Sequence, residues 1–441
     1  MPLWVALLPQ ALKMRLQGRS DLLAILHNSG WLLFDKVLRL GLGLLVGAWV
    51  ARYLGPAQFG ELAYVLAFIT FFQAITSLGL DGIVVRDIAQ HKERANTILG
   101  TAFMLRLGAG IACWLFAVGG MAWLNGLQDR SVVLTALVAG TLVFQAADTV
   151  DLWFQSQSQS RRTVMAKLLA YILTSGVKVL LILNEAPLVG FAAILVLEGL
   201  TSAVGLAIAY KRFPCDNRWA HSVDTARQLF VESWPFLLSG ISIMVYMRID
   251  HIMIKEMLGP SELGIYAAVL PLATLWQFIP MTLSVSLAPF VTRKKAESEE
   301  AYWQALQKIF KFYALVGWIV CIPVAVLAHL AVNTLYGPAY QDGAVILSIY
   351  VFTNLFINMG VAQGLWLLND RRAGLSLVKT IIGAVIAVLG NWLLIPYYGI
   401  TGVAAVAVMA QLVSAVLTNF FFSKRLFFIQ IRSLLWPFFK L

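Results

Sequence analysis

The chain has 441 residues, of which 60% are hydrophobic and only 12% are charged, and its formal net charge is +11. Soluble globular domains carry about 25% charged residues, so a mean hydropathy of +0.80 excludes a soluble enzyme, a nucleic-acid-binding protein and a disordered chain. The positive charge therefore has to be examined by its position relative to a membrane. The three cysteines, Cys113, Cys215 and Cys321, indicate no disulfide framework.

Apolar runs long enough to cross a bilayer recur along the whole chain. A spanning helix needs about 20 apolar residues, and a helix satisfies its own backbone hydrogen bonds in lipid. Residues 1–29 are interpreted as a cytoplasmic arm rather than a signal peptide, because basic residues follow their apolar stretch instead of preceding it. The sequence predicts twelve transmembrane helices, at 30–51, 58–80, 98–122, 132–155, 164–183, 188–210, 233–255, 263–290, 305–327, 343–367, 374–395 and 400–422.

Basic residues in the expected connections are concentrated on one side of the membrane. With the N-terminus in the cytoplasm, the opposite side holds only Arg52 and Arg130. This pattern follows the positive-inside rule and predicts an even number of spans with both termini in the cytoplasm. The expected organisation is a cytoplasmic N-terminal arm, an N-lobe, a cytoplasmic linker, a C-lobe and a cytoplasmic tail, at 1–29, 30–210, 211–232, 233–422 and 423–441.

A short sequence recurs at equivalent places in the two expected lobes. Leu54–Gly60 follows the first span, and the similar Leu258–Gly264 follows the seventh. Two copies at equivalent positions predict two six-helix lobes related by a pseudo-two-fold axis along the membrane normal. The alternative interpretation is that a Gly-Pro turn between two helices is generic.

Some basic residues fall inside the expected spans, where a charge at the bilayer centre costs at least about 2.5–3.5 kcal/mol. The ones near span ends are expected to extend to the headgroups, and these are Lys167, Lys255, Lys308, Lys311 and Lys379. Others are too deep for this. At a rise of 1.5 Å per residue, Arg39 and Arg106 lie roughly 12–13 Å into their spans, and Lys178 and Arg248 lie roughly 21–23 Å in.

The deep cations are candidates for binding an anionic cargo such as a pyrophosphate, which arginine binds through bidentate, charge-assisted hydrogen bonds. The candidate substrate-binding residues are Arg39, Arg106, Lys178, Arg248 and Lys36. The candidate residues for orienting them or binding a coupling cation are Asp35, Asp250, Asp148 and Glu198. Purely structural ion pairing is the alternative, and Asp35 and Arg39 are spaced to pair within one helix.

Motifs for enzymatic chemistry are missing from the sequence. There is no glycine-rich loop ending in Gly-Lys-Ser/Thr for a nucleotide, and the five histidines are scattered without metal-ligand spacing. We therefore expect no catalytic residue, no metal site and no cofactor apart from a coupling Na⁺ or H⁺. The protein is expected not to be an enzyme.

Three stretches carry a family resemblance. Residues 28–60, the segment Leu78–Arg86 after the second span, and Tyr246–Asp250 with the following Leu258–Tyr266 resemble polysaccharide-biosynthesis and O-antigen flippases. These flippases form a branch of the multidrug/oligosaccharidyl-lipid/polysaccharide exporter superfamily. The resemblance covers roughly residues 28–425, and Arg248 is the cavity residue best supported by it.

The resemblance implies a multi-pass protein of the bacterial inner membrane that moves undecaprenyl-pyrophosphate-linked oligosaccharide from the cytoplasmic to the periplasmic leaflet. It implies alternating access through a cation-lined cavity, coupled to an ion gradient or the membrane potential. The expected partners are the lipid-linked oligosaccharide, membrane lipids, and the polymerase and chain-length proteins of the same pathway, with no nucleic acid.

Three other functions are weighed against this one. A drug or small-molecule exporter of the same superfamily commonly carries cationic cargo, which favours a net-acidic cavity. A membrane enzyme of glycan assembly, such as a polymerase, needs a long extracytoplasmic loop, and none is expected here. A structural assembly subunit without transport activity would have little use for buried charges.

Overall fold

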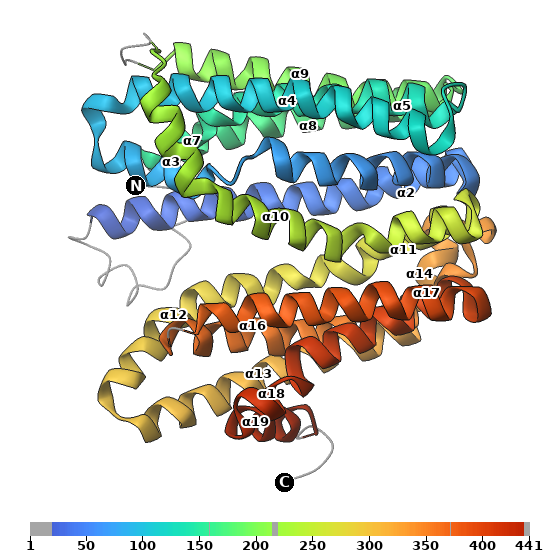
Figure 1. The fold of residues 1–441 in the computed structure, drawn as a ribbon. Helices are drawn as coiled ribbons and strands as arrows, with labels where there is room; N and C mark the ends of the chain where they lie inside the picture. Colours follow the sequence, from blue (N-terminus) through green and yellow to red (C-terminus); the bar gives the residue numbers. More distant parts are fainter. Residues whose placement is uncertain (1–19, 158, 214–218, 371, 436–441) are drawn as a thin grey trace. The chain divides into compact units, whose positions relative to one another are not determined.

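The structure is a computed structural model that describes residues 20–157, 159–213, 219–370 and 372–435. Every regular element within these ranges is a helix (Figure 1), which confirms the expected all-α architecture for them. The helices up to the middle of the chain are α2 (Ser20–Thr76), α3 (Asp81–Gln90), η2 (Lys92–Arg94), α4 (Ala95–Asn125), α5 (Arg130–Val138), α6 (Gly140–Phe144), η3 (Gln145–Ala147), α7 (Asp148–Ser156), α8 (Ser160–Leu183), α9 (Leu188–Lys211) and α10 (Val223–Leu258). The later ones are α11 (Pro260–Thr274), η4 (Leu275–Gln277), α12 (Phe278–Glu297), α13 (Glu299–Val326), α14 (Ala328–Tyr336), η5 (Pro338–Tyr340), α15 (Gly343–Tyr350), α16 (Thr353–Asn369), α17 (Ala373–Leu412), η6 (Val413–Leu417), α18 (Asn419–Phe422) and α19 (Lys424–Leu435).

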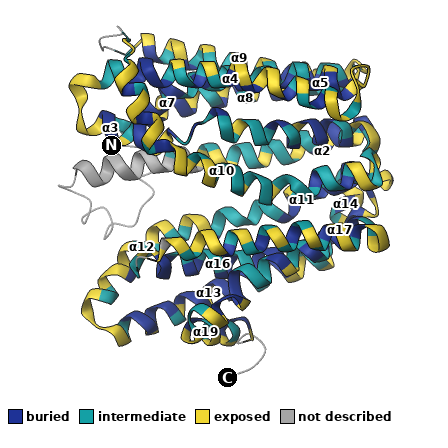
Figure 2. Cartoon of the chain, viewed as in Figure 1, coloured by how far each residue is buried: buried dark blue, intermediate teal, exposed yellow. Residues whose placement is uncertain are grey.

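Ten helical segments within the described ranges are long and apolar enough to cross a membrane. They are Phe34–Gln90, Lys92–Asn125, Arg130–Ser156, Ser160–Leu183, Leu188–Lys211, Val223–Leu258, Pro260–Glu297, Glu299–Val326, Gly343–Asn369 and Gly374–Phe422. Exposed residues recur along the full length of these helices (Figure 2), and many of them are large and apolar, as in Phe116 and Trp123. A soluble monomer rarely exposes apolar surface on this scale, so the chain is a multi-pass membrane protein.

The two longest segments are interrupted by glycine. The backbone leaves the helical region at Gly55 (φ 72°, ψ 167°) and at Gly399 (φ 56°, ψ −143°). A residue other than glycine adopts such positive φ values only at a cost. Both breaks lie where the sequence predicts the end of one span and the start of the next, and each segment is long enough for two crossings of a core about 30 Å thick.

The first of two compact units contains the described residues up to Val46 together with Ile69–Ile241. Its helices pack as neighbouring pairs, with α8 against α9, α4 against α5 and α6, and α3 against α7. A core cluster of this unit contains buried apolar side chains from α3, α4, α7, α9 and α10, including Ile88, Leu99, Phe154 and Tyr210.

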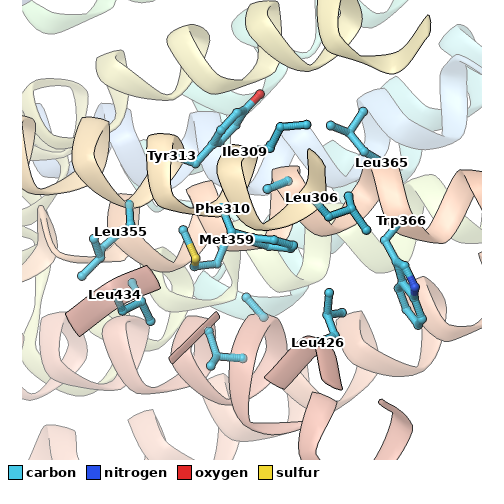
Figure 3. Packing of buried hydrophobic residues seen from close by; sticks show 14 of the residues in the cluster. Leu306, Ile309, Phe310, Tyr313, Leu355, Met359, Leu365, Trp366, Leu426 and Leu434 are labelled. Carbon is cyan, nitrogen blue, oxygen red and sulfur yellow. The ribbon is translucent and has the colours of Figure 1, made fainter. Parts of the chain in front are cut away.

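The second unit contains Gly47–Phe68 together with the described residues from Ser242 onward. Figure 3 shows its core, where Phe310 of α13, Met359 of α16 and Leu426 of α19 lie together. Residues 47–68 thus pack with the later part of the chain, although they were expected in the N-lobe. The lobe boundaries expected from the sequence stay a prediction.

The repeated sequence adopts the same backbone conformation in both copies, and the two copies contact each other inside the second unit. Gly259 (φ 98°, ψ 175°) repeats the conformation of Gly55, and each is followed by a proline that starts a helical stretch. A Cβ atom on Gly60 would meet the carbonyl oxygen of Pro260, and one on Gly264 would meet that of Pro56. The motif is therefore a structural repeat with reciprocal contacts, and the generic-turn interpretation does not account for this reciprocity.

The expected cytoplasmic tail contains a packed helix. In α19, Leu426, Gln430, Ser433 and Leu434 are buried, and the Trp318 indole of α13 donates a hydrogen bond to the Leu434 carbonyl oxygen at 2.9 Å. The apolar side chains of this helix are spaced for one face, as in an amphipathic helix. The tail thus forms part of the core of the second unit.

Candidate functional site

Charged side chains from three helices surround Tyr171 in the first unit. On α2, the Arg39 Nε donates to the Asp35 Oδ1 at 2.8 Å, one turn away. The Arg39 guanidinium lies over the Tyr171 ring, 4.9 Å from its centroid, and the Lys178 Nζ lies 5.8 Å from the same centroid. Lys178 also forms an ion pair with Glu198 of α9 at 3.3 Å. Asp35, Arg39, Tyr171, Lys178 and Glu198 are called the Tyr171 cluster below.

Helix periodicity explains how this cluster forms. Asp35 and Arg39 are four residues apart on α2, and Tyr171 and Lys178 are two turns apart on α8, so each pair shares one face of its helix. The Tyr171 hydroxyl also donates to the Arg39 carbonyl oxygen at 3.3 Å, which joins α8 to α2. The cluster therefore ties together helices that are far apart in the sequence.

The Tyr171 cluster has spare hydrogen-bonding capacity. Its two cations are each paired with one acid, yet the Arg39 Nη2 is buried without a hydrogen-bond partner among the described residues. Leaving a buried donor unsatisfied costs about 1–3 kcal/mol. The 3.3 Å Lys178–Glu198 contact is longer than the 2.7–2.9 Å typical of charge-assisted bonds. The cluster thus contains one donor without a hydrogen-bond partner among the described residues and one ammonium at a long distance from its acid.

Arg106 contacts residues outside the Tyr171 cluster. Its side chain is 2% exposed, and its guanidinium pairs with Asp81, whose side chain is 68% exposed. It also approaches the Ser77 carbonyl oxygen at 3.5 Å. Arg106 thus holds the turn at Leu78 and Gly79, where φ is positive at both residues.

Two further candidates also lie outside the cluster. Lys36 is exposed on α2. Asp148 pairs with Lys167 at 2.7 Å, and Lys167 also binds Asp151 at 2.8 Å. The structure therefore brings together four of the expected residues, Asp35, Arg39, Lys178 and Glu198, and does not join Arg106, Lys36 or Asp148 to them.

The remaining candidates, Arg248 and Asp250, meet at His251 in the second unit. The His251 Nδ1 lies 2.7 Å from the Asp250 Oδ1, and the Arg248 Nη1 lies 3.4 Å from the His251 Nε2. The Tyr266 hydroxyl of α11 donates to the Asp250 Oδ2 at 2.6 Å. Arg248, Asp250, His251 and Tyr266 are called the His251 site below. No group of three or more His, Cys, Asp or Glu residues that could hold a metal ion occurs in the described ranges.

The expectation that Lys379 extends to the headgroups is wrong. Lys379 is 5% exposed, and its Nζ donates to the Asn419 side-chain oxygen. Asn419 is hydrogen-bonded in turn to Gln363 of α16 and to Gln430 of α19. Gln430 in this network comes from α19, a helix that the sequence analysis does not predict, so the packing of Asn419 beside Lys379 was missed.

Sequence reasoning also missed Tyr171 and His251. Tyr171 has one detectable signal, its spacing of seven residues from Lys178, which places both on one helix face. His251 directly follows Asp250 and lies three residues after Arg248, a spacing at which side chains on a helix can meet. The adjacent arginine and carboxylate, rather than a metal-ligand pattern, are the signal by which His251 could have been found.

Comparisons with known proteins agree with this architecture. The family described as "Polysaccharide biosynthesis protein" matches residues 25–291. The capsular polysaccharide biosynthesis protein CapF of Staphylococcus aureus is 21% identical over 208 residues, covering 47% of this chain and 52% of the relative. The succinoglycan biosynthesis transport protein ExoT of Rhizobium meliloti is 22% identical over 244 residues, covering 55% of this chain and 49% of the relative. The chain thus spans about half the length of each of these two relatives.

Two solved structures share the fold along most of the chain. An inward-facing multidrug-resistance MATE family transporter of the MOP superfamily superposes with a TM-score of 0.72 and 17% identity, covering 89% of this chain and 95% of that one. The lipid II flippase MurJ, in an inward closed conformation, superposes with a TM-score of 0.73 and 12% identity, covering 93% and 91%. At these identities the likeness shows the fold.

Proposed function

The chain belongs to the polysaccharide biosynthesis protein family, and we propose that it is a flippase for undecaprenyl-pyrophosphate-linked oligosaccharide. It moves this cargo from the cytoplasmic to the periplasmic leaflet of a bacterial inner membrane. The observation that carries the proposal is the Tyr171 cluster, in which a buried guanidinium nitrogen of Arg39 has no partner among the described residues. Such a donor, beside a second cation inside a helical membrane protein, suits an anionic headgroup.

The chemistry of the cluster matches a pyrophosphate. The planar guanidinium of arginine can donate two parallel hydrogen bonds to phosphate oxygens, and lysine adds a point charge with freely rotating donors. Asp35 and Glu198 hold the two cations in place while the site is empty, which avoids an uncompensated buried charge. The cargo would replace the Lys178–Glu198 contact and fill the open position on Arg39.

The names of similar proteins support a lipid-linked saccharide as cargo. One relative is named for capsular polysaccharide biosynthesis and another for succinoglycan transport, and a protein with the same fold is a lipid II flippase. The chain matches about half of each relative. The identity of the cargo and its transport by alternating access are therefore part of this proposal. The polymerase and chain-length proteins of the same pathway are its proposed partners.

We propose that the chain crosses the membrane twelve times, with both termini in the cytoplasm. The breaks at Gly55 and Gly399 would divide two of the ten membrane-length segments into two crossings each. The reciprocal contacts of the repeated sequence support two lobes related by a pseudo-two-fold axis. An even number of crossings also agrees with the concentration of basic residues on one side.

A second candidate function is export of a small molecule or drug. The MATE transporter's shared fold favours it, and so does the near-neutral charge of the Tyr171 cluster, because both of its cations have acidic partners. Such an exporter would bind its cargo without needing the free guanidinium nitrogen. The two functions therefore differ in their dependence on Arg39.

The proposal is tested with the purified protein in liposomes, using a fluorescent undecaprenyl-pyrophosphate oligosaccharide and a quencher that reaches only the outer leaflet. Arg39→Gln and Lys178→Gln should each slow flipping by about 10-fold or more, because a hydrogen bond to a charged group contributes about 1.5–3 kcal/mol. Arg94→Gln is the matched control, since Arg94 is exposed. Unchanged flipping in both cluster variants would contradict the proposal, and transport of the cationic dye ethidium without any flipping would favour the second candidate.

A further inference from the structure

The hydrogen bonds of the His251 site define which nitrogen of the ring carries the proton. An arginine guanidinium is always protonated and can only donate hydrogen bonds. Because the Arg248 Nη1 faces the His251 Nε2 at 3.4 Å, that nitrogen has to be an acceptor. The imidazole proton therefore sits on Nδ1, from which it is donated to the Asp250 Oδ1 at 2.7 Å.

Asp250 fixes the ring in this arrangement. Its Oδ1 also accepts the His251 backbone N–H at 2.8 Å, and its Oδ2 accepts the Tyr266 hydroxyl at 2.6 Å. Three donors thus hold this carboxylate in one position. His251 is 4% exposed, so the ring has little freedom to turn its Nε2 away from Arg248.

A second proton on His251 would reverse its interaction with Arg248. Protonation at Nε2 turns the acceptor into a donor and gives the ring a positive charge. Two positively charged N–H donors would then face each other, and the longer and more flexible Arg248 side chain would have to leave. A proton and the Arg248 guanidinium thus compete for the same lone pair.

We propose that the His251 Nε2 is the binding site of a coupling proton, and that occupation of this site releases Arg248 to bind the anionic headgroup of the cargo at a position separate from the Tyr171 cluster. This inference rests on the proposed flippase function. It identifies the proton as the coupling ion and His251 as the residue that binds it. Arg248 is suited to this role because it forms no ion pair with a carboxylate among the described residues.

Other titratable groups surround the ring. The Tyr266 ring of α11 makes an edge-to-face contact with the His251 ring. The Tyr350 ring of α15 makes the same kind of contact with Tyr266. Tyr246 of α10 lies against Gly383 of α17, and one turn before Gly383 is Lys379, whose amine binds Asn419. Histidine is the side chain that ordinarily changes charge between about pH 5 and 8, and it directly contacts Arg248.

The test measures binding of undecaprenyl pyrophosphate to the detergent-purified full-length protein between about pH 8 and about pH 5.5. Wild-type affinity should rise about tenfold as the pH falls, which is a typical coupling between two linked sites. In His251→Gln, the affinity should change with pH only as far as protonation of the probe itself changes it, because glutamine cannot take up a proton. His329→Gln is the matched control, since His329 is exposed, and it should keep the wild-type profile.

Two further variants test whether competition between the proton and Arg248 causes the pH dependence. Arg248→Gln should show no rise in affinity as the pH falls, because protonation of His251 then releases no guanidinium. Lys379→Met should keep the wild-type profile, and a loss of the pH dependence in this variant but not in His251→Gln would overturn the proposal. His251→Asn repeats the measurement if His251→Gln does not fold.

The outcomes distinguish this inference from the proposed function. Binding of the probe with the same pH profile in wild type and His251→Gln overturns the proton site and leaves the flippase standing. A full pH-dependent rise in Arg248→Gln also overturns it, because the histidine would then act directly. Absence of binding in the wild type at every pH overturns both.

Discussion

Tyr171 contacts both cations of its cluster, with its ring facing Arg39 and Lys178 and its hydroxyl bonded to the Arg39 carbonyl oxygen. A cation over an aromatic face is stabilised by about 0.5–2 kcal/mol. Tyr171→Leu should therefore slow flipping about 2- to 30-fold, whereas Tyr171→Phe keeps the ring, loses only the 3.3 Å hydrogen bond of the hydroxyl and should slow flipping less than Tyr171→Leu does. Initial rates in liposomes measure the difference, and equal losses in the two variants would argue against a role of the ring.

The Arg106–Asp81 pair is asymmetric, because the arginine is buried and the aspartate is exposed. Asp81→Asn removes the counter-ion and leaves a buried guanidinium charge, so we expect the free energy of unfolding to fall by about 1–3 kcal/mol. Arg106→Met combined with Asp81→Asn removes both charges and should recover most of that loss. Melting temperatures in detergent provide the measurement, and an Asp81→Asn variant as stable as wild type would show that the pair is not needed.

At the scale of elements, the repeated sequence brings two helix starts into backbone contact. The approach between Gly60 and Pro260, and between Gly264 and Pro56, leaves no room for a side chain. Backbone atoms on the opposing stretch of chain cannot move aside as a flexible side chain could. The two glycines are therefore required by packing, whereas Gly55 and Gly259 are required by their positive φ values.

Alanine at Gly60 or Gly264 should lower the stability of the protein. Alanine normally stabilises a helix by about 0.5–1 kcal/mol relative to glycine, and this gain is the expected result for Gly47→Ala, where no atom lies within 4 Å of the added Cβ. Gly60→Ala and Gly264→Ala should instead lower the melting temperature in detergent, by similar amounts because their contacts are equivalent. A rise in all three variants would contradict the close contact.

The helix α19 supplies hydrogen bonds that the second unit needs. Gln430 accepts from the Asn419 side chain at 2.7 Å and donates to the Ala415 carbonyl oxygen at 3.1 Å. Gln430→Ala removes both of these hydrogen bonds, while the Asn419 amide still donates to Gln363 and to the Ala415 carbonyl oxygen. At about 0.5–1.5 kcal/mol for each lost bond, the variant should lose about 1–3 kcal/mol of stability. Arg432→Ala on the exposed face of the same helix is the control. Thermal unfolding that is equally affected by the two variants would exclude a specific role of the hydrogen bonds.

At the scale of the whole molecule, the number of crossings determines which side each connection reaches. Twelve crossings place Tyr398, beside the break at Gly399, outside the cytoplasm, and they place Glu93 inside it. Both positions are exposed, so a cysteine at either one would be open to reagents on its own side.

The topology is tested with Tyr398→Cys and Glu93→Cys in a variant whose three native cysteines are replaced by alanine. A membrane-impermeant maleimide should label Tyr398→Cys in intact cells. It should label Glu93→Cys only after the membrane is permeabilised, which makes this variant the internal control. A requirement for permeabilisation at both positions would rule out twelve crossings.

Much of the fold was predictable because its determinants are local. Hydropathy over a window of about 20 residues identifies membrane-length helices, and the Gly-Pro sequences at Gly55 and Gly259 indicate breaks because few other residues adopt such backbone angles. The helix α19 was missed because its apolar residues are spaced for one face and its overall hydropathy is low, so a hydropathy window does not detect it.

The amino-acid sequence alone shows that this protein lies in a membrane, which stretches are long and apolar enough to cross it, and that Leu54–Gly60 has a second copy. The spacing within α2 also predicts the Asp35–Arg39 pair, whereas the partners of buried charges on other helices depend on the three-dimensional packing. Arg39 contacts Tyr171 of another helix, and the Lys379 amine is buried and bonded to Asn419 rather than extended to the headgroups. The reason is physical, because helix periodicity determines which residues share a face, while the facing partner depends on how each helix is rotated against its neighbours.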